Sequence, residues 1–329
     1  MTIWFRARMG RRVPLLVVSL MMTTACASNS RPTLSPTKMA EFWQEPADAA
    51  QRDLFNGGGG AALAPHPNAT FTLMSADPSG FSPGLDVKDE QGREWSVKLG
   101  PEARTEVVAS RIVWAMGYHQ PPVYYLRRFA LRDNGVVKTE GAGRFRLKPS
   151  TQKSMGEWSW RHNPFLDTQP FAGLFVLMTV LNNWDIKTQQ NAVYRTSVKG
   201  AQPEYQYVIK DLGASFGKTN WWLPGTRDDI DGFEREPFIE GVSGNRVKFH
   251  FRGAWREPQL LNSVTPQDLR WMCERLALLT RGQWLDAFRA GGYTDGEADR
   301  FVRRIQQKID EGLQAGSASA PRVANRERP

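Results

Sequence analysis

The stretch Leu181–Asn191 reads LNNWDIKTQQN and overlaps the end of an apolar run, Phe171–Asn183, whose composition predicts a buried helix. A second acidic stretch, Tyr207–Gly217 (YVIKDLGASFG), begins about twenty residues later. An aspartate in a polar loop and an aspartate at the end of a strand are typical of a metal–phosphate site. We therefore interpret the rest of the chain as a scaffold for these groups. Within seven residues the first stretch offers one carboxylate, one lysine and two carboxamides: Asp185, Lys187, Gln190 and Asn191.

The composition is that of a globular protein, with 329 residues, 40% hydrophobic and 23% charged. This length allows one large domain or two lobes that share a cleft. The formal charge is +9, but four arginines lie in a predicted signal, and without them 39 basic residues face 34 acidic ones, a net charge of +5. Such a charge permits anionic ligands or membrane surfaces, and we expect no nucleic-acid partner.

Cysteine and histidine usage argues against two classes of site. Two cysteines, Cys26 and Cys273, cannot form a disulfide framework or a cysteine-based zinc site. The four histidines are scattered without the spacing of metal ligands.

The N-terminus has the pattern of an export signal. Residues 1–12 are basic, and the apolar run Val13–Met22 is too short to span a membrane comfortably. Small residues before Cys26 resemble a bacterial lipoprotein cleavage site. This predicts a signal peptide over residues 1–25 and a lipid anchor on Cys26 that holds the protein in the cell envelope, facing the periplasm. Thr23 stands where that pattern prefers leucine, so ordinary cleavage nearby remains an alternative.

Residues 26–70 are rich in serine, proline, alanine and glycine, which predicts a flexible tether with one short helix around Lys38–Gln44. The run Gly57–Gly60 lacks the lysine and hydroxyl residue of a phosphate loop, so we interpret it as linker. The tail, residues 314–329, is small and basic and is predicted to be disordered.

From Phe71 the pattern changes to strands. Phe81–Val87 and Glu94–Leu99 predict a hairpin, in which Lys98 points away from the apolar face of the second strand. The next segment predicts a helix that begins after Pro101 and ends before Gly117. It carries two glutamates four residues apart, Glu102 and Glu106.

The remaining pattern predicts an α+β protein with a small sheet-rich lobe over about 71–149 and a larger, mostly helical lobe over about 150–313. Two C-terminal helices are expected, one from Thr265 to about Ala290 and one from Thr294 to about Leu313.

Three segments resemble the atypical kinase superfamily, which includes the phosphatidylinositol kinases, HipA-type toxin kinases, spore-coat CotH kinases and secretory-pathway Fam20 kinases. These segments are Trp95–Tyr118 (WSVKLGPEARTEVVASRIVWAMGY), Asn182–Asn191 (NNWDIKTQQN) and Lys210–Gly217 (KDLGASFG). The resemblance spans about residues 81–217. It implies a two-lobed protein-kinase-like fold, ATP or another phosphate donor as substrate, and Mg²⁺ or Mn²⁺ as cofactor.

The resemblance also implies roles for particular residues. Lys98 would contact the nucleotide phosphates and Glu106 would pair with it, with Glu102 as a competitor for that pairing. Asp185 would be the catalytic carboxylate. Asn191 and Asp211 would be the metal ligands.

The chain departs from the family pattern in the catalytic loop. The aspartate of that loop is usually followed by Arg-His, and here Ile186-Lys187 follow. Lys187 is therefore a candidate for the missing cation. The family's asparagine falls five residues after the aspartate, where this chain has Gln190. Ser79–Gly84 (SGFSPG) is the candidate for the loop that covers the phosphates.

Two functions follow from these observations. The first is a phosphotransferase that binds a nucleotide with divalent metal and transfers phosphoryl to an unknown acceptor, chosen by loops around Trp221–Trp255. The second is a catalytically inactive, kinase-like envelope lipoprotein that acts as a binding module, because ATP is scarce outside the cytoplasm. An envelope hydrolase is disfavoured, since the sequence has no Gly-x-Ser-x-Gly elbow and no histidine cluster.

Overall fold

A seven-stranded sheet carries Lys98, the lysine that is expected to contact the nucleotide phosphates. The computed structural model describes residues 31–200, 203–219, 224–251 and 258–318. In the sheet the strand order is β4-β7-β3-β2-β1-β5-β6, and neighbours are antiparallel except the parallel pair β1 and β5. Its strands are β1 (Thr70–Asp77), β2 (Gly84–Lys88), β3 (Glu94–Leu99), β4 (Val123–Leu126), β5 (Phe129–Asp133), β6 (Val136–Glu140) and β7 (Gly143–Lys148).

Side-chain alternation along β3 gives the sheet two different faces. Trp95 and Val97 are buried with Phe71, Val87 and Phe145 in an apolar core on one face. The residues between them point the other way, as the period of two requires. The predicted hairpin of β2 and β3 and the direction of the β3 lysine are confirmed.

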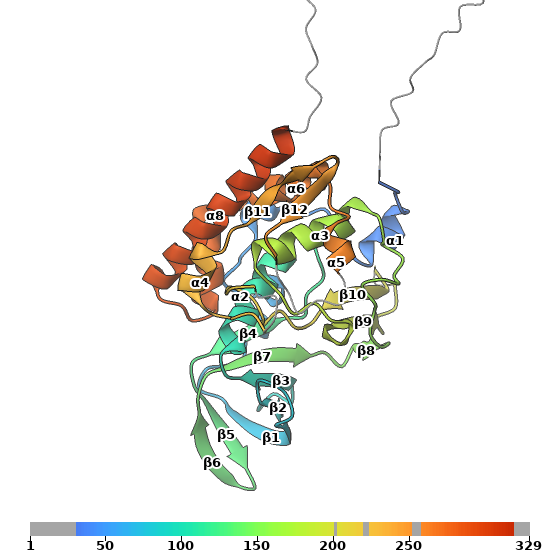
Figure 1. Ribbon diagram of the computed structural model, residues 1–329. Coiled ribbons are helices and arrows are strands. Elements are labelled where there is room, and N and C mark those ends of the chain that lie inside the picture. The colour runs from blue at the N-terminus through green and yellow to red at the C-terminus, as the bar shows by residue number, and fades with distance from the viewer. Residues whose placement is uncertain (1–30, 201–202, 220–223, 252–257, 319–329) are drawn as a thin grey trace, which may run out of the picture. The chain divides into compact units, whose positions relative to one another are not determined.

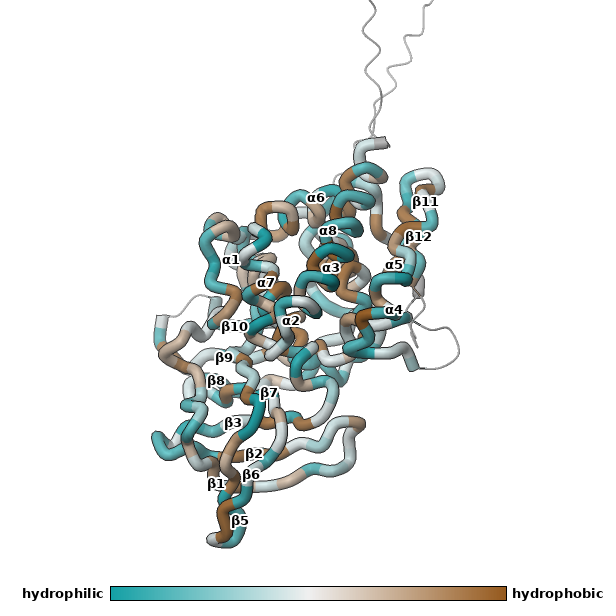
Figure 2. The backbone as a smooth tube through the Cα atoms, turned by 90° about the vertical axis from the view of Figure 1, so that its left-hand side faces the viewer, coloured by the Kyte–Doolittle hydropathy of each residue, from teal (hydrophilic) through white to brown (hydrophobic). Residues whose placement is uncertain are grey.

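The second apolar core lies in the helical part of the chain. Viewed from two directions, the seven-stranded sheet and helices α3, α6 and α8 lie at opposite ends of the described chain from Pro32 onward (Figures 1 and 2). Because each part has its own core, the predicted two-lobed α+β architecture is confirmed. The helices are α1 (Pro36–Ala40), α2 (Glu102–Ala115), α3 (Gln169–Val180), α4 (Ile230–Arg235), α5 (Pro258–Leu261), α6 (Pro266–Leu276), α7 (Arg281–Ala290) and α8 (Asp295–Ala318).

Two small sheets complete the fold. One has the order β10-β9-β8 and lies between the seven-stranded sheet and the helices in Figure 1. The other is a hairpin of β11 and β12. Their strands are β8 (Gln152–Ser154), β9 (Asn191–Thr196), β10 (Tyr205–Ile209), β11 (Ile239–Ser243) and β12 (Arg246–Phe249).

Local sequence signals explain where helices α2 and α3, which position the site, begin and end. Helix α2 starts after Pro101, and Gly117 follows its end with φ of +90°, which favours glycine. Thr168 caps the start of helix α3, because its hydroxyl accepts a hydrogen bond from the Phe171 amide. It is buried nearly all round, as predicted for this apolar run.

The N-terminal segment differs from the prediction of a tether over residues 26–70. From Pro32 it packs against the helical core, with Phe42 and Leu54 buried. The glycine run forms a 3-10 turn at Gly57–Gly59, and a Cβ at Gly57 would lie only 1.8 Å from Nη1 of Arg111. Small residues here permit close packing, so a composition typical of linkers was misleading.

The C-terminal helices also differ in their bounds. The helix predicted from Thr265 to about Ala290 is two helices, because Thr280 and Gln283 form a capping box that starts α7. Helix α8 continues to Ala318, beyond the predicted end near Leu313. Among the described residues, none of the helices is both long enough and apolar enough to cross a membrane. Cys26 lies outside the described residues.

Candidate functional site

A buried glutamate lies between two cations from neighbouring strands. In the register of β3 and β7, Lys98 is opposite Arg144, so both side chains leave the same face of the sheet. Glu106 of α2 forms ion pairs with both: one carboxylate oxygen is 3.0 Å from the Lys98 Nζ, and the other is 2.9 Å from the Arg144 Nε. Only 2% of the Glu106 and Arg144 side chains is exposed. The predicted pairing of Lys98 with Glu106 is present.

Asp211 completes this group from the other lobe. Its Oδ2 is 2.8 Å from the Lys98 Nζ, and its Oδ1 accepts a hydrogen bond from the Gly213 amide at 3.2 Å. Burial raises the pKa of Asp211, but the charge and hydrogen bond of Lys98 outweigh this and hold it below its usual value. Burial likewise lowers the pKa of Lys98, and the carboxylates of Glu106 and Asp211 raise it above the usual range. Both groups are therefore ionised at neutral pH.

Glu102, one turn before Glu106, is also part of the group. Its carboxylate is 3.4 Å from the Lys98 Nζ and accepts a hydrogen bond of 3.0 Å from the Ser82 hydroxyl. Ser82 belongs to the loop Ser79–Gly84, so this contact joins the candidate phosphate loop to α2. Gly213 lies against Glu102, where a Cβ would be 2.7 Å from the glutamate Cβ. Glycine at this place lets α2 approach the segment that carries Asp211.

The loop that carries Asp185 is tied at both ends to the segment that carries Asp211. The Trp184 amide donates to the Ala214 carbonyl at 3.3 Å, and the Lys210 amide donates to the Gln190 carbonyl at 2.8 Å. The structure therefore brings the two acidic stretches of the sequence together. Asp185 itself is held by its own loop: Oδ1 is 2.7 Å from the Lys187 Nζ, and Oδ2 accepts from Gln190 at 2.8 Å.

Asn191 lies at the start of β9 and is fully buried. Its amide nitrogen donates to the Trp158 carbonyl at 2.9 Å, which ties the strand to the preceding loop. Its side-chain oxygen has no hydrogen-bond partner in the part of the chain that the structure describes. Gln190, which occupies the position of the family's asparagine, is instead bonded to Asp185.

The residues present fit a metal that arrives with a phosphate group. Within the described ranges, no three or more histidine, cysteine, aspartate or glutamate residues are grouped to hold a metal ion. Mg²⁺ in phosphate sites commonly uses only one or two carboxylates, together with phosphate oxygens and water. Asp211 and Asp185 offer two carboxylates on adjoined segments, and the buried oxygen of Asn191 is an unused acceptor. This arrangement does not provide a metal site whose ligands all come from the protein.

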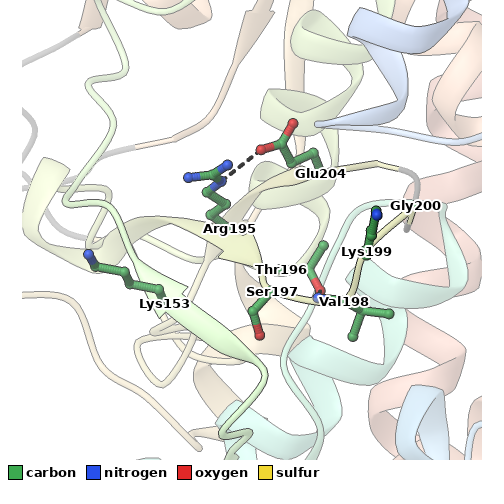
Figure 3. A pocket seen from close by; sticks show the side chains of 8 residues that line it. All are labelled: Lys153, Arg195, Thr196, Ser197, Val198, Lys199, Gly200 and Glu204. Atoms are coloured by element: carbon green, nitrogen blue, oxygen red, sulfur yellow. Dashed lines mark hydrogen bonds and ion pairs between the residues drawn. The ribbon is translucent and has the colours of Figure 1, made fainter.

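A hollow of about 490 Å³ lies elsewhere, along β8, β9 and the turn before β10 (Figure 3). Its charged side chains are Lys153, Arg195, Lys199 and Glu204, and Arg195 is paired with Glu204 at 2.7 Å. None of the predicted site residues lines it. The group around Lys98 is the candidate site, because opposite charges from four separate segments meet there: β3, β7, α2 and the segment of Asp211.

Neither the family models nor the curated proteins include a match to this chain. Solved structures of low identity resemble it. The crystal structure of a Helicobacter pylori proinflammatory kinase, CtkA, is 12% identical and matches 77% of this chain and 99% of that chain, with a TM-score of 0.42. The Golgi casein kinase with Mn and ADP bound is 7% identical and matches 78% of this chain and 75% of that chain, with a TM-score of 0.38. A second structure of that kinase has the same identity and TM-score.

All three are structures of kinases. At such identities and TM-scores the likeness carries no conclusion about the function or the substrates of this chain.

Two residues of the site were missed in the sequence. Arg144 was read only as part of a strand, and its contact with Glu106 depends on the register of β3 against β7. Arg227 lies within the loops around Trp221–Trp255 that are expected to choose the acceptor, and its Nη1 is 2.5 Å from Glu102. The one available signal was the acidic neighbourhood of Arg227, which includes Asp228 and Asp229.

Proposed function

We propose that the protein is a phosphotransferase that binds a nucleotide with a divalent metal between its two lobes. The observation that carries this proposal is the contact of Lys98 with Glu106 and Asp211, at 3.0 and 2.8 Å. A strand lysine, a helix glutamate and a loop aspartate from three separate segments are brought to one point. Phosphoryl transfer requires this kind of arrangement, because it depends on positioned charge rather than on covalent chemistry.

Each residue has a role in this proposal. Lys98, held in place by Glu106, contacts the phosphates of the donor. Asp211 would hold the metal, with Asn191 as a further ligand, and Asp185 would orient the nucleophile. Mg²⁺ or Mn²⁺ supplies charge neutralisation when bound. Lys187, which is 57% exposed and paired with Asp185, is placed to supply the cation that the family has after its aspartate.

Nucleotide binding tests the proposal directly. We expect ATP with Mg²⁺ or Mn²⁺ at about 100 times its Kd to raise the Tm of the purified full chain by about 5 °C or more. Lys98→Met and Asp211→Asn should abolish this shift. Lys88→Met is the matched control, since Lys88 lies on the adjacent strand and pairs with Glu94 at the surface. An unchanged Tm with both metals, or a shift in Asp211→Asn equal to that of the wild type, contradicts the proposal.

A separate measurement distinguishes catalysis from binding alone. Asp185→Asn should leave the Tm shift in place and lower the rate of transfer or donor hydrolysis by about 100-fold or more, because the group that orients the nucleophile is lost. Equal, near-zero rates in wild type and variant, with binding intact, would favour the alternative of a non-catalytic binding module.

We also propose that the protein is exported and anchored in the cell envelope through a lipid on Cys26, facing the periplasm. The support is the sequence pattern around residues 13–26. Membrane fractionation and mass spectrometry of the mature N-terminus should show a lipid-modified Cys26. A Cys26→Ala variant that stays in the membrane fraction with an unaltered mature N-terminus would count against the anchor.

A further inference from the structure

Arg227 lies where the two lobes meet at the site. Its Nη1 is 2.5 Å from the Glu102 Oε1, and only 11% of its side chain is exposed. Its guanidinium carbon lies 3.9 Å from the centre of the Phe81 ring and 5.0 Å from that of Trp184. Phe81 belongs to the candidate phosphate loop Ser79–Gly84, and Trp184 precedes Asp185. Arg227 therefore touches the elements on both sides of the proposed phosphate position.

The backbone after Arg227 is fixed by a network that crosses both lobes. Asp228 has φ of +53°, a left-handed conformation that is uncommon for residues other than glycine. It is held there by Arg104 of α2, whose Nε is 2.6 Å from Oδ2, and by Tyr293, whose hydroxyl donates to Oδ1 at 2.7 Å. The Asp228 amide donates to the Ser215 carbonyl. An unfavourable backbone conformation persists only where its surroundings determine it this strongly.

The backbone before Arg227 is fixed as well. The Thr226 amide donates to the Lys218 carbonyl at 2.9 Å, and the Thr226 carbonyl accepts from the Trp184 indole at 2.8 Å. The Thr226 hydroxyl donates to Asp229, which in turn accepts from the first turn of α4. Hydrogen bonds on both sides of Arg227 thus hold its backbone in place. The entropic cost of ordering this segment is therefore met before any ligand binds.

The charges around Glu102 explain what this arginine is suited to bind. Glu102 is shared by two cations, since the Lys98 Nζ is 3.4 Å from Oε2 and Arg227 is bound to Oε1. A guanidinium has five donors in a planar fork that matches phosphate oxygens, and one carboxylate leaves several of them available. A polyphosphate that enters between these cations would meet both of them.

We propose that Arg227 is a second phosphate-binding residue of the site, which exchanges its contact with Glu102 for the terminal phosphate of a polyphosphate donor. The proposal rests on the proposed function for the identity of the site. It adds a residue from the segment after the Asp-Leu-Gly stretch. It also defines the ligand class as a nucleoside triphosphate or an inorganic polyphosphate, whose shared chemistry is a chain of phosphates.

Isothermal titration of the full chain with three probes tests this assignment. The probes are ATP, AMP and inorganic tripolyphosphate, each with MnCl₂. In Arg227→Met we expect the affinity for ATP and tripolyphosphate to fall about 10-fold or more, because a charge-assisted pair is lost, while the affinity for AMP changes less than about twofold. Arg227→Lys keeps the positive charge but lacks the planar guanidinium donors, so it should give an intermediate loss of affinity.

Two further variants separate phosphate binding from a structural role. Glu102→Gln frees Arg227 and removes a negative charge, so the affinity for tripolyphosphate should stay equal or rise. If Arg227 merely held the lobes together, Glu102→Gln and Arg227→Met would weaken binding alike, and the proposal would be overturned. Arg195→Met, at a surface pair with Glu204, is the control for removal of an arginine.

The outcomes also distinguish this proposal from the proposed function. Wild-type binding of ATP that is unchanged in Arg227→Met overturns the role of Arg227 and leaves the proposed function standing. Arg227-dependent binding of tripolyphosphate without transfer from any nucleotide supports the phosphate site and overturns the phosphotransferase. No binding of either ATP or tripolyphosphate by the wild type overturns both.

Discussion

Glu106 holds the site together at the scale of single residues. It is an almost fully buried anion that touches two cations, Lys98 and Arg144, while Asp211 supplies the second negative charge. Two basic and two acidic side chains therefore lie together in a region that is mostly shielded from water. Such groups stabilise a fold only as a complete set, because removal of one partner leaves the opposite charge buried and uncompensated.

We predict that Glu106→Gln lowers the free energy of unfolding by about 3–5 kcal/mol, the usual cost of breaking a buried ion pair. Urea denaturation of the purified chain measures it. Glu274→Gln is the control: Glu274 pairs with Arg270 at 2.7 Å, with both side chains about half exposed, and its loss should cost less than about 1 kcal/mol. Equal effects in the two variants would show that the Lys98–Glu106–Arg144 group contributes no more than a surface pair.

At the scale of elements, helix α8 fixes the end of α3 from which the Asp185 loop departs. Lys308 of α8 is fully buried and donates to the Val180 carbonyl at 3.0 Å and to the Asn182 Oδ1 at 2.7 Å. Asn182 in turn donates to the Gly217 carbonyl at 2.7 Å. Burial lowers the pKa of Lys308 well below its usual value, so the hydrogen bonds have to offset a desolvation cost. One side chain thereby connects α8 to both loops that carry the acids of the site.

Lys308→Met should lower the free energy of unfolding by about 1–3 kcal/mol, because buried acceptors at the C-terminus of α3 lose their donor. Denaturation of the purified chain again provides the measurement. Arg303→Met, on the same helix and 62% exposed, should change the stability by less than about 0.5 kcal/mol. A Lys308→Met variant more stable than the wild type would mean that the desolvation cost exceeds the value of the hydrogen bonds.

At the scale of the whole molecule, the segment from Pro32 to the first strand is part of the folded unit. Phe42 packs among rings from four other places in the chain, with centroid distances of 4.8 to 6.1 Å. The Trp43 indole donates to the Met116 carbonyl at 2.8 Å, close to the end of α2. The segment therefore covers the helical core and supports the helix that carries Glu106. The four rings around Phe42 are those of Tyr118, Trp158, Phe165 and Phe171.

Phe42→Ala should therefore cost about 3–5 kcal/mol of unfolding free energy, as expected when a buried ring leaves a cavity. Phe55→Ala, in the same segment but 50% exposed, is the matched control and should change the stability by about 0.5 kcal/mol or less. Thermal or urea unfolding of both variants decides the question. If the two changes have similar small effects, the segment acts as the tether that its composition indicates.

The sequence by itself determined the elements whose signals are local. The alternation in β3, the proline and glycine around α2 and the apolar run of α3 each reflect energies set by residues a few positions apart. The same patterns placed Lys98 on a strand, Glu106 on the next helix, and Asp185 and Asp211 in the two loops. The predicted contacts of Lys98 with Glu106 and the joining of the two acidic stretches are present in the structure.

Only the tertiary structure decided which distant residues complete the site. Arg144 reaches Glu106 because β7 pairs with β3 in one register, and Arg227 reaches Glu102 because a segment of the helical lobe is fixed against α2. Likewise, Gly57 packs closely against Arg111, although the composition of its segment is that of a linker. Long-range pairing and close packing depend on shape and burial over the whole fold, which a local pattern of residues does not encode.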